Sequence, residues 1–224
     1  MGKIAEVRGH IARAAEVSGR CPEDVTLIAV TKTVEASRIR AAAAAGLRHF
    51  AENRVQEASG KIVALSDLDI TWHMVGHLQT NKVKTALRIF DIIHSIDSLR
   101  LAETVSRWAE NSVPVLIQVN VSGEATKGGF PFEEAAKAAG QIARLPDLEL
   151  LGLMTIAPLV CDVETIRPLF RRLRQLSRSL GLSELSMGMT DDYGVAVEEG
   201  ATLVRIGGAI FGQRQSIKEI GRQR

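Results

Sequence analysis

Short apolar runs alternate with longer segments of helical periodicity over most of the 224-residue chain. This alternation is typical of βα units built around a parallel sheet. Eight apolar runs predict eight strands, the number that closes an α/β TIM barrel of the (β/α)₈ type, and the chain length suits one such barrel. The predicted strands cover residues 25–30, 47–51, 70–75, 89–96, 113–121, 148–155, 184–187 and 202–206.

Helical segments are expected between these strands. Gly46 marks the end of one helix and Pro146 follows another, because both residue types are common just beyond helix C-termini. An extra helix is expected before the first strand and a short basic segment after the last one, from Gln213. We therefore expect a single domain over residues 1–224. The expected helices cover residues 3–18, 36–45, 98–109, 132–144 and 163–180.

Charge and composition exclude several classes of partner. The net charge is +2, and no run of like charges or interleaved basic and aromatic residues occurs, so no nucleic acid partner is expected. Charged residues interrupt the N-terminal segment, and no run reaches transmembrane length, so neither a signal peptide nor a membrane partner is expected. Cys21 and Cys161 lack the spacing of a disulfide framework or metal site. A cytoplasmic, monomeric protein is expected.

Lys32 comes directly after the first predicted strand and Thr31. The carboxyl ends of barrel strands meet on one face, where barrel enzymes hold their reactive groups. A lysine at the mouth of an apolar pocket loses its proton more easily, and its amine then attacks a carbonyl to give a Schiff base. The alternative is a lysine that extends from a strand end into water. The segment alone leaves both interpretations open.

Hydroxyl groups and glycines lie at or just beyond the carboxyl ends of the last two predicted strands. Backbone N–H groups exposed by glycine bind phosphate at this position in many barrels. A tight turn explains each glycine pair equally well when it is taken alone. Together with Lys32, however, these loops indicate a cofactor that carries both an aldehyde and a phosphate. The residues concerned are Ser186, Thr190, Gly207 and Gly208.

His73 and His77 are four residues apart, a spacing that would suit a metal on a helix. Gly76 and the strand pattern over residues 70–75 argue against a helix, so no metal site is expected. His77, at the strand exit, is expected to line the pocket, and His73 is expected to be a core residue with satisfied hydrogen bonds. The acidic residues near the last helices are expected on the solvated surface: Asp191, Asp192, Glu198 and Glu199.

Several long motifs follow one another in a specific order, the most specific being WHMVGHLQTNK at residues 72–82. On these motifs the chain, from about residue 25 to residue 214, closely resembles the pyridoxal phosphate homeostasis proteins (the YggS family), whose barrel is of the alanine-racemase type. The other motifs are at residues 28–33, 49–57, 118–124, 152–156, 185–192 and 204–212.

The resemblance implies that the cofactor is pyridoxal 5′-phosphate (PLP), held as a Schiff base on Lys32. It places Asn53 against the ring, Arg205 at the ring nitrogen, and the phosphate at Ser186, Thr190, Gly207 and Gly208. The chain departs from the family at two of these positions. Members of the family usually have serine where this chain has Thr190, and threonine where it has Gly208. The missing threonine hydroxyl removes a phosphate donor that is worth about 0.5–1.5 kcal/mol.

Arginine only donates hydrogen bonds, so Arg205 would keep the ring nitrogen unprotonated and weaken the ring as an electron sink. Racemisation also needs a second proton donor, which in the alanine racemases is a tyrosine from another domain and subunit. The one tyrosine of this chain is Tyr193, expected to be a surface or packing residue. The resemblance therefore implies PLP homeostasis by binding, buffering and delivery to apo PLP-dependent enzymes, without robust catalysis. The alternatives are a low-activity amino-acid racemase and a barrel that is only an interaction module.

Overall fold

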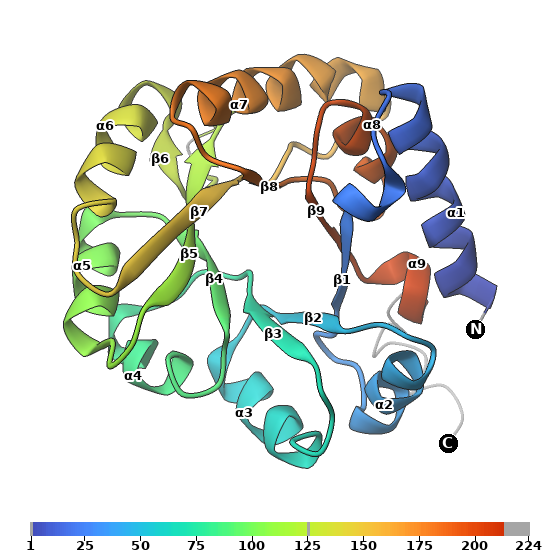
Figure 1. Cartoon of the computed structure of the whole chain (residues 1–224), viewed down its shortest axis with the longest axis horizontal. Helices are drawn as coiled ribbons and strands as arrows, with labels where there is room; N and C mark the ends of the chain where they lie inside the picture. Colours follow the sequence, from blue (N-terminus) through green and yellow to red (C-terminus); the bar gives the residue numbers. More distant parts are fainter. Residues whose placement is uncertain (1, 125, 213–224) are drawn as a thin grey trace, which may run out of the picture.

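The computed structural model describes residues 2–124 and 126–212, and it shows a closed barrel of eight parallel strands surrounded by helices (Figure 1). Pairing of β4 with β5 closes the sheet, which confirms the predicted (β/α)₈ barrel. The barrel strands are β1 (Thr26–Val30), β2 (His49–Glu52), β3 (Thr71–Met74), β4 (Ile92–Ile96), β5 (Val113–Asn120), β7 (Leu148–Met154), β8 (Glu184–Ser186) and β9 (Leu203–Ile206).

The expected helices are present in the described part of the chain, and the extra N-terminal helix is α1, which packs on α8 and α9 (Figure 1). The 163–180 segment starts as a 3₁₀ turn, Val163–Ile166, before α7. The basic segment from Gln213 lies outside the described residues. The helices are α1 (Gly2–Val17), α2 (Ala36–Ala44), α3 (Val55–Ala64), α4 (Val83–Ala86), α5 (Leu99–Trp108), α6 (Phe132–Ile142), α7 (Arg167–Ser179), α8 (Tyr193–Glu198) and α9 (Gly208–Phe211).

A further short strand, β6 (Phe130–Pro131), pairs with the last residues of β5 and precedes α6 (Figure 1). Its two residues are too few to give a periodic pattern, which is why the sequence did not predict it. The pairing ties the loop after β5 to the barrel rim.

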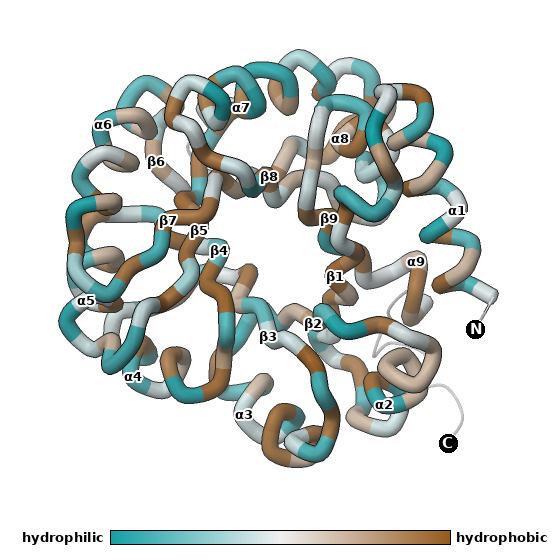
Figure 2. Tube along the Cα trace, in the orientation of Figure 1, coloured by the Kyte–Doolittle hydropathy of each residue, from teal (hydrophilic) through white to brown (hydrophobic). Residues whose placement is uncertain are grey.

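Side chains fill two apolar layers. The larger lies between the strands and the helices. Many strand residues are apolar, whereas the helices alternate apolar and polar residues (Figure 2). The smaller lies inside the barrel and includes Ile28, Ala51 and Leu116. Because strand side chains alternate between the two faces, one face of each strand packs under the helices and the other fills the barrel. Packed side chains therefore fill the barrel interior below the carboxyl ends of the strands.

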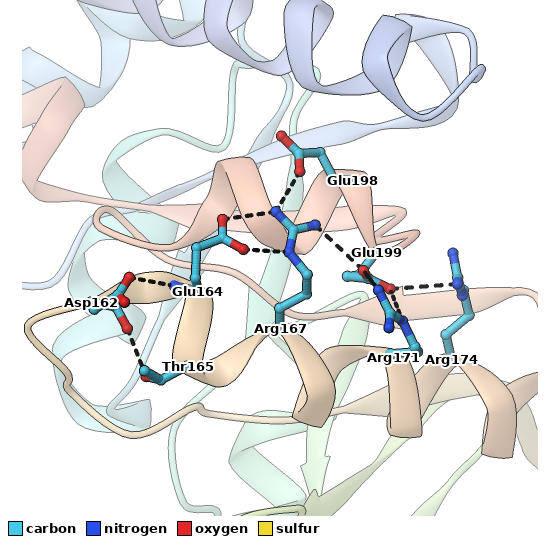
Figure 3. Close-up of polar contacts among 8 residues, drawn as sticks. All are labelled: Asp162, Glu164, Thr165, Arg167, Arg171, Arg174, Glu198 and Glu199. Atoms are coloured by element: carbon cyan, nitrogen blue, oxygen red, sulfur yellow. Dashed lines mark hydrogen bonds and ion pairs between the residues drawn. The ribbon is translucent and has the colours of Figure 1, made fainter.

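An ion-pair network joins α7 to the C-terminus of α8 (Figure 3). Glu199 is buried and accepts hydrogen bonds from Arg171 at 2.7 Å and Arg167 at 3.4 Å, and Arg167 also contacts Glu198 at 2.7 Å. Burial acts to raise the pKa of Glu199, but the hydrogen bonds from Arg171 and Arg167 lower it overall. The expectation of a solvated surface position is therefore wrong for Glu199. It is also wrong for Asp192, which is buried.

Candidate functional site

Lys32 follows β1 in a turn that a strained residue shapes. Thr33 has a φ of +63°, which is unusual for a β-branched residue and persists only where the surroundings hold it. Its N–H donates to Glu57 Oε1 at 2.5 Å. Lys32 is half-buried, and its amine makes no hydrogen bond or ion pair with the described residues. The turn therefore presents an unpaired amine at the end of the strand.

A second amine, Lys61 on α3, lies close to this turn but is fully engaged. Its Nζ contacts the carbonyl oxygen of Thr31 at 2.7 Å, Glu52 Oε1 at 2.8 Å and Glu57 Oε1 at 2.7 Å. Glu52 is buried, and its burial raises its pKa despite the hydrogen bonds from Lys61 and Thr31. Lys61 uses its three N–H groups here, so Lys32 is the amine that remains available. Sequence reasoning missed Lys61, for which the Glu57–Lys61 spacing was the one signal.

Asn53 lies at the exit of β2, beside the exit of β3. A Cβ on Gly76 would lie 2.2 Å from the Asn53 carbonyl oxygen, so this close approach requires glycine. The side-chain oxygen Oδ1 of Asn53 is buried and has no hydrogen-bond partner in the described structure. A buried polar atom without a partner is what a bound polar group would satisfy.

His77 lies at the rim of the barrel. Its Nδ1 is 2.8 Å from Asp97 Oδ2, and 69% of its side chain is exposed. The structure therefore holds His77 by a carboxylate at the surface, and no hydrogen bond or ion pair joins it to Lys32 or Asn53.

The loops after β8 and β9 meet at Thr190 and Gly208. A Cβ on Gly208 would lie 3.7 Å from Thr190 Oγ1, so the hydroxyl faces the start of α9. The N–H groups of Thr190, Gly208 and Ala209 have no hydrogen-bond acceptor among the described residues. A hydroxyl beside free amide groups offers several hydrogen-bond donors in one place, the chemistry that binds an anion such as phosphate.

Gly188 and Gly207 give these loops their shape. Gly188 has a φ of +92°, and a Cβ there would lie 2.6 Å from the Cβ of Ala196. A Cβ on Gly207 would lie 3.1 Å from the Val30 carbonyl oxygen. Gly188 is therefore required by backbone geometry. Gly207 allows the β9 exit to lie close against the end of β1, where a Cβ would make a tight contact.

Arg205 points into the barrel and is buried. Its Nη1 donates to Ser186 Oγ at 2.6 Å and its Nη2 donates to the Thr155 carbonyl oxygen at 2.7 Å. Burial lowers the pKa of Arg205 to about 10, and the field of Asp192 opposes this effect only in part. The Ser186 hydroxyl, expected from the resemblance to contact phosphate, is fully buried and has Arg205 and His94 as its partners.

Tyr193 faces away from the barrel interior. Its hydroxyl is 3.0 Å from His10 Nδ1 of α1, and both residues line a pocket of about 480 Å³ between α1 and residues 190–194. The tyrosine hydroxyl is thus tied to the outer helix.

Three features fit a ligand that carries an aldehyde and a phosphate: the free Lys32 amine, the unpartnered Asn53 oxygen, and the donor cluster around Thr190. Within residues 2–124 and 126–212, no group of three histidine, cysteine or acidic side chains is placed to hold a metal ion. No described helix has the length and apolar character that crossing a membrane requires.

The sequence profile of the family described as "Alanine racemase, N-terminal domain" matches residues 9–215. The pyridoxal phosphate homeostasis protein of Pseudomonas aeruginosa is 45% identical over 216 residues and is matched over 94% of both chains. That of Aquifex aeolicus is 43% identical over 222 residues, covering 95% of this chain and 97% of the relative.

Two solved structures have folds similar to that of this chain. PipY of Synechococcus elongatus with PLP bound has a TM-score of 0.81 and 42% identity, covering 90% of this chain and 100% of PipY. Alanine racemase from Corynebacterium glutamicum has a TM-score of 0.66 at 18% identity, covering 93% of this chain and 61% of the racemase. The second similarity is one of fold alone.

Proposed function

Because the chain belongs to the family of pyridoxal phosphate homeostasis proteins, whose barrel is of the alanine-racemase type, we propose that it binds PLP through Lys32 and serves PLP homeostasis. The observation that carries this proposal is the contrast between the two amines near β1. Lys61 is engaged by two carboxylates and a carbonyl oxygen, whereas Lys32 has no partner in the described structure. The structure of PipY, at 42% identity, has PLP bound, which supports PLP as the ligand.

The other site residues would bind and orient the group. Thr190 and the free amide groups at Gly208, beside Gly207, would bind the phosphate, and Asn53 would lie against the ring. Arg205 would face the ring nitrogen and, as a donor that keeps its proton, would leave that nitrogen unprotonated. When bound, PLP supplies an aldehyde that reacts with amines. His77 would close the rim, and Ser186 would act through Arg205.

We further propose that the protein is a carrier without robust catalysis. The Tyr193 hydroxyl is tied to His10 on α1, so it is not available as a second proton donor at Lys32. In this proposal a single-domain monomer in the cytoplasm buffers PLP and delivers it to apo PLP-dependent enzymes.

Replacement of the proposed lysine tests the binding mode. Lys32→Ala should fold, lose the visible absorbance of the PLP-loaded protein, and lose the adduct that borohydride fixes to the chain. Lys137→Ala, at an exposed lysine of α6, is the control and should behave like the wild type. Peptide mapping that finds the reduced adduct on Lys61, Lys82 or Lys127 would overturn the assignment.

The carrier role needs its own test. The loaded protein should give up PLP to an apoenzyme and leave L- and D-alanine unchanged in deuterated water, as followed by NMR and chiral chromatography. Rapid interconversion that disappears in Lys32→Ala would make the protein a small racemase instead.

A further inference from the structure

Three histidines form a continuous hydrogen-bonded chain through the barrel interior. His49 Nδ1 is 3.0 Å from His73 Nε2, and His73 Nδ1 is 2.8 Å from His94 Nε2. His94 Nδ1 is 2.9 Å from Ser186 Oγ, which accepts from Arg205. The three rings come from the adjacent strands β2, β3 and β4, and only His49 is partly exposed. This chain of hydrogen bonds therefore runs from Arg205 to the amino-terminal end of β2.

The contacts assign one proton arrangement to this chain. Arg205 can only donate, so the Ser186 oxygen accepts from it and the Ser186 hydroxyl hydrogen is left to donate. The one other polar atom bonded to this oxygen in the described structure is His94 Nδ1, which must therefore be the acceptor. It follows that His94 carries its proton on Nε2.

The same reasoning extends along the chain. His94 Nε2–H donates to His73 Nδ1, and His73 Nε2–H donates to His49 Nδ1. The reversed arrangement would give the buried Ser186 oxygen two donors and leave its own hydrogen without an acceptor, which is costly inside a protein. Burial also lowers the pKa of His73 to about 3 and that of His94 well below its usual value, so both rings are neutral near pH 7.

This arrangement aligns every O–H and N–H dipole with its negative end toward Arg205. The guanidinium needs such compensation because it is buried and no carboxylate lies within 4 Å of it among the described residues. The nearby Asp192 carboxylate accepts a hydrogen bond from Met189 N instead. Oriented dipoles thus stabilise a buried cation that lacks an ion-pair partner.

We propose that His49, His73 and His94 are positioning residues that hold Arg205 at the ring-nitrogen end of the PLP site through a chain of aligned dipoles. This inference rests on the proposed function, because PLP is the group that Arg205 would face. A neutral chain leaves Arg205 as a cation without an ion pair, free to donate to the ring nitrogen. A carboxylate in the same place would compete for that donor.

NMR of the protein without PLP tests the proton arrangement independently of the cofactor. With ¹⁵N-labelled histidine at pH 8, long-range ¹H–¹⁵N spectra should show His49, His73 and His94 neutral, with the proton on Nε2. A proton on Nδ1 of His94 or His73 would overturn the proposal.

Variants of nearly equal size test the effect on PLP. His94→Leu removes the acceptor for Ser186, and PLP should bind about two- to tenfold more weakly, the range for loss of one hydrogen bond between neutral groups. Its visible absorption maximum should also shift. His94→Asn keeps an acceptor near the Nδ1 position and should largely restore both. His49→Leu, which touches neither Ser186 nor Arg205, should shift the spectrum in the same direction by less.

Ile93→Ala is the stability control, because Ile93 is a buried residue of β4 that takes no part in the hydrogen-bonded row of histidines. It should lower Tm without changing the spectrum or the PLP affinity. Wild-type affinity and spectrum in both His94→Leu and His49→Leu would reduce the histidines to a structural role and refute the proposal. If His94→Leu does not fold, His49→Leu and the NMR assignment decide it. A wild-type protein that binds no PLP would contradict the proposed function, while the NMR result would still report on the chain.

Discussion

Local surroundings distinguish residues of the same type in this barrel. Lys32 and Lys61 both lie near the end of β1, but carboxylates engage only Lys61. Ser186 ends β8 and Thr190 lies in the loop that follows it, but the first hydroxyl faces Arg205 and the second faces the start of α9. The chemical type of a residue therefore makes it a candidate for the site, and its hydrogen-bond partners in the fold indicate its role.

Gly208 provides a prediction at the residue scale. A Cβ at this position makes only ordinary contacts, 3.7 Å from Thr190 Oγ1, so the Cβ itself is sterically tolerated. Gly208→Thr should bind PLP about two- to tenfold more tightly because it adds one hydroxyl donor near the proposed phosphate site. Isothermal titration calorimetry checks this value.

Gly208→Ala is the matched control, since it adds the Cβ without the hydroxyl. It should leave PLP affinity close to that of wild type. Equal affinities for Gly208→Thr and Gly208→Ala would place the phosphate elsewhere.

At the element scale, buried charges tie neighbouring segments together around the site. Lys61 of α3 joins the end of β1 to Glu52 of β2, and Glu57 of α3 holds the Thr33 turn. The turn that carries Lys32 thus depends on a helix that contributes no residue to the proposed PLP contacts. Glu199 connects α8 to α7 in a similar manner (Figure 3).

Lys61→Met should therefore destabilise the protein by about 3 kcal/mol at pH 7, because it leaves the buried Glu52 without its cation. The penalty should shrink as the pH falls. The Glu52 pKa is already raised by burial, so in the variant the folded state binds a proton at higher pH than the unfolded state. Urea denaturation at pH 7 and pH 5 measures both values.

The double variant Lys61→Met, Glu52→Gln removes the charge together with its partner. It should recover most of the lost stability at pH 7 and abolish the pH dependence of the difference. A penalty in Lys61→Met that is equal at the two pH values would contradict this account.

At the scale of the whole molecule, the barrel interior combines an apolar floor with a polar histidine chain. His73 is buried, and burial followed by the field of His49 lowers its pKa to about 3. Above pH 6.5 the ring is neutral in both the folded and unfolded states. Below pH 6.5 His73 binds a proton in the unfolded state but not in the folded state. The free energy of unfolding therefore falls as the pH drops from 6.5 toward 3.

For His73 alone, this loss should reach about 2 kcal/mol at pH 5 relative to pH 8. His94, whose pKa is also lowered, acts in the same direction. Denaturation curves at pH 8, 6 and 5 should show a shallower decline in His73→Asn than in the wild type. Identical slopes for the two proteins would show that His73 is protonated in the folded state.

The amino-acid sequence was enough to predict the barrel, because alternating apolar runs and helices bury their faces in few other ways. The sequence also indicated Lys32 as a candidate site residue, because the end of a predicted strand can be located from the apolar pattern. The expectation that His73 is a buried residue with hydrogen-bond partners is confirmed. The roles proposed for Lys32, Asn53 and Arg205 toward PLP stay predictions.

Which polar groups pair with one another became known from the folded structure. His49, His73 and His94 occupy inward positions on three adjacent strands, but their register and their contact with Ser186 depend on how the sheet closes. Glu199 has an ordinary surface-like sequence context and is nevertheless buried among arginines of α7. Hydrogen bonds and ion pairs act over a few ångströms between residues far apart in the chain, so periodicity predicts the elements, whereas packing selects the partners.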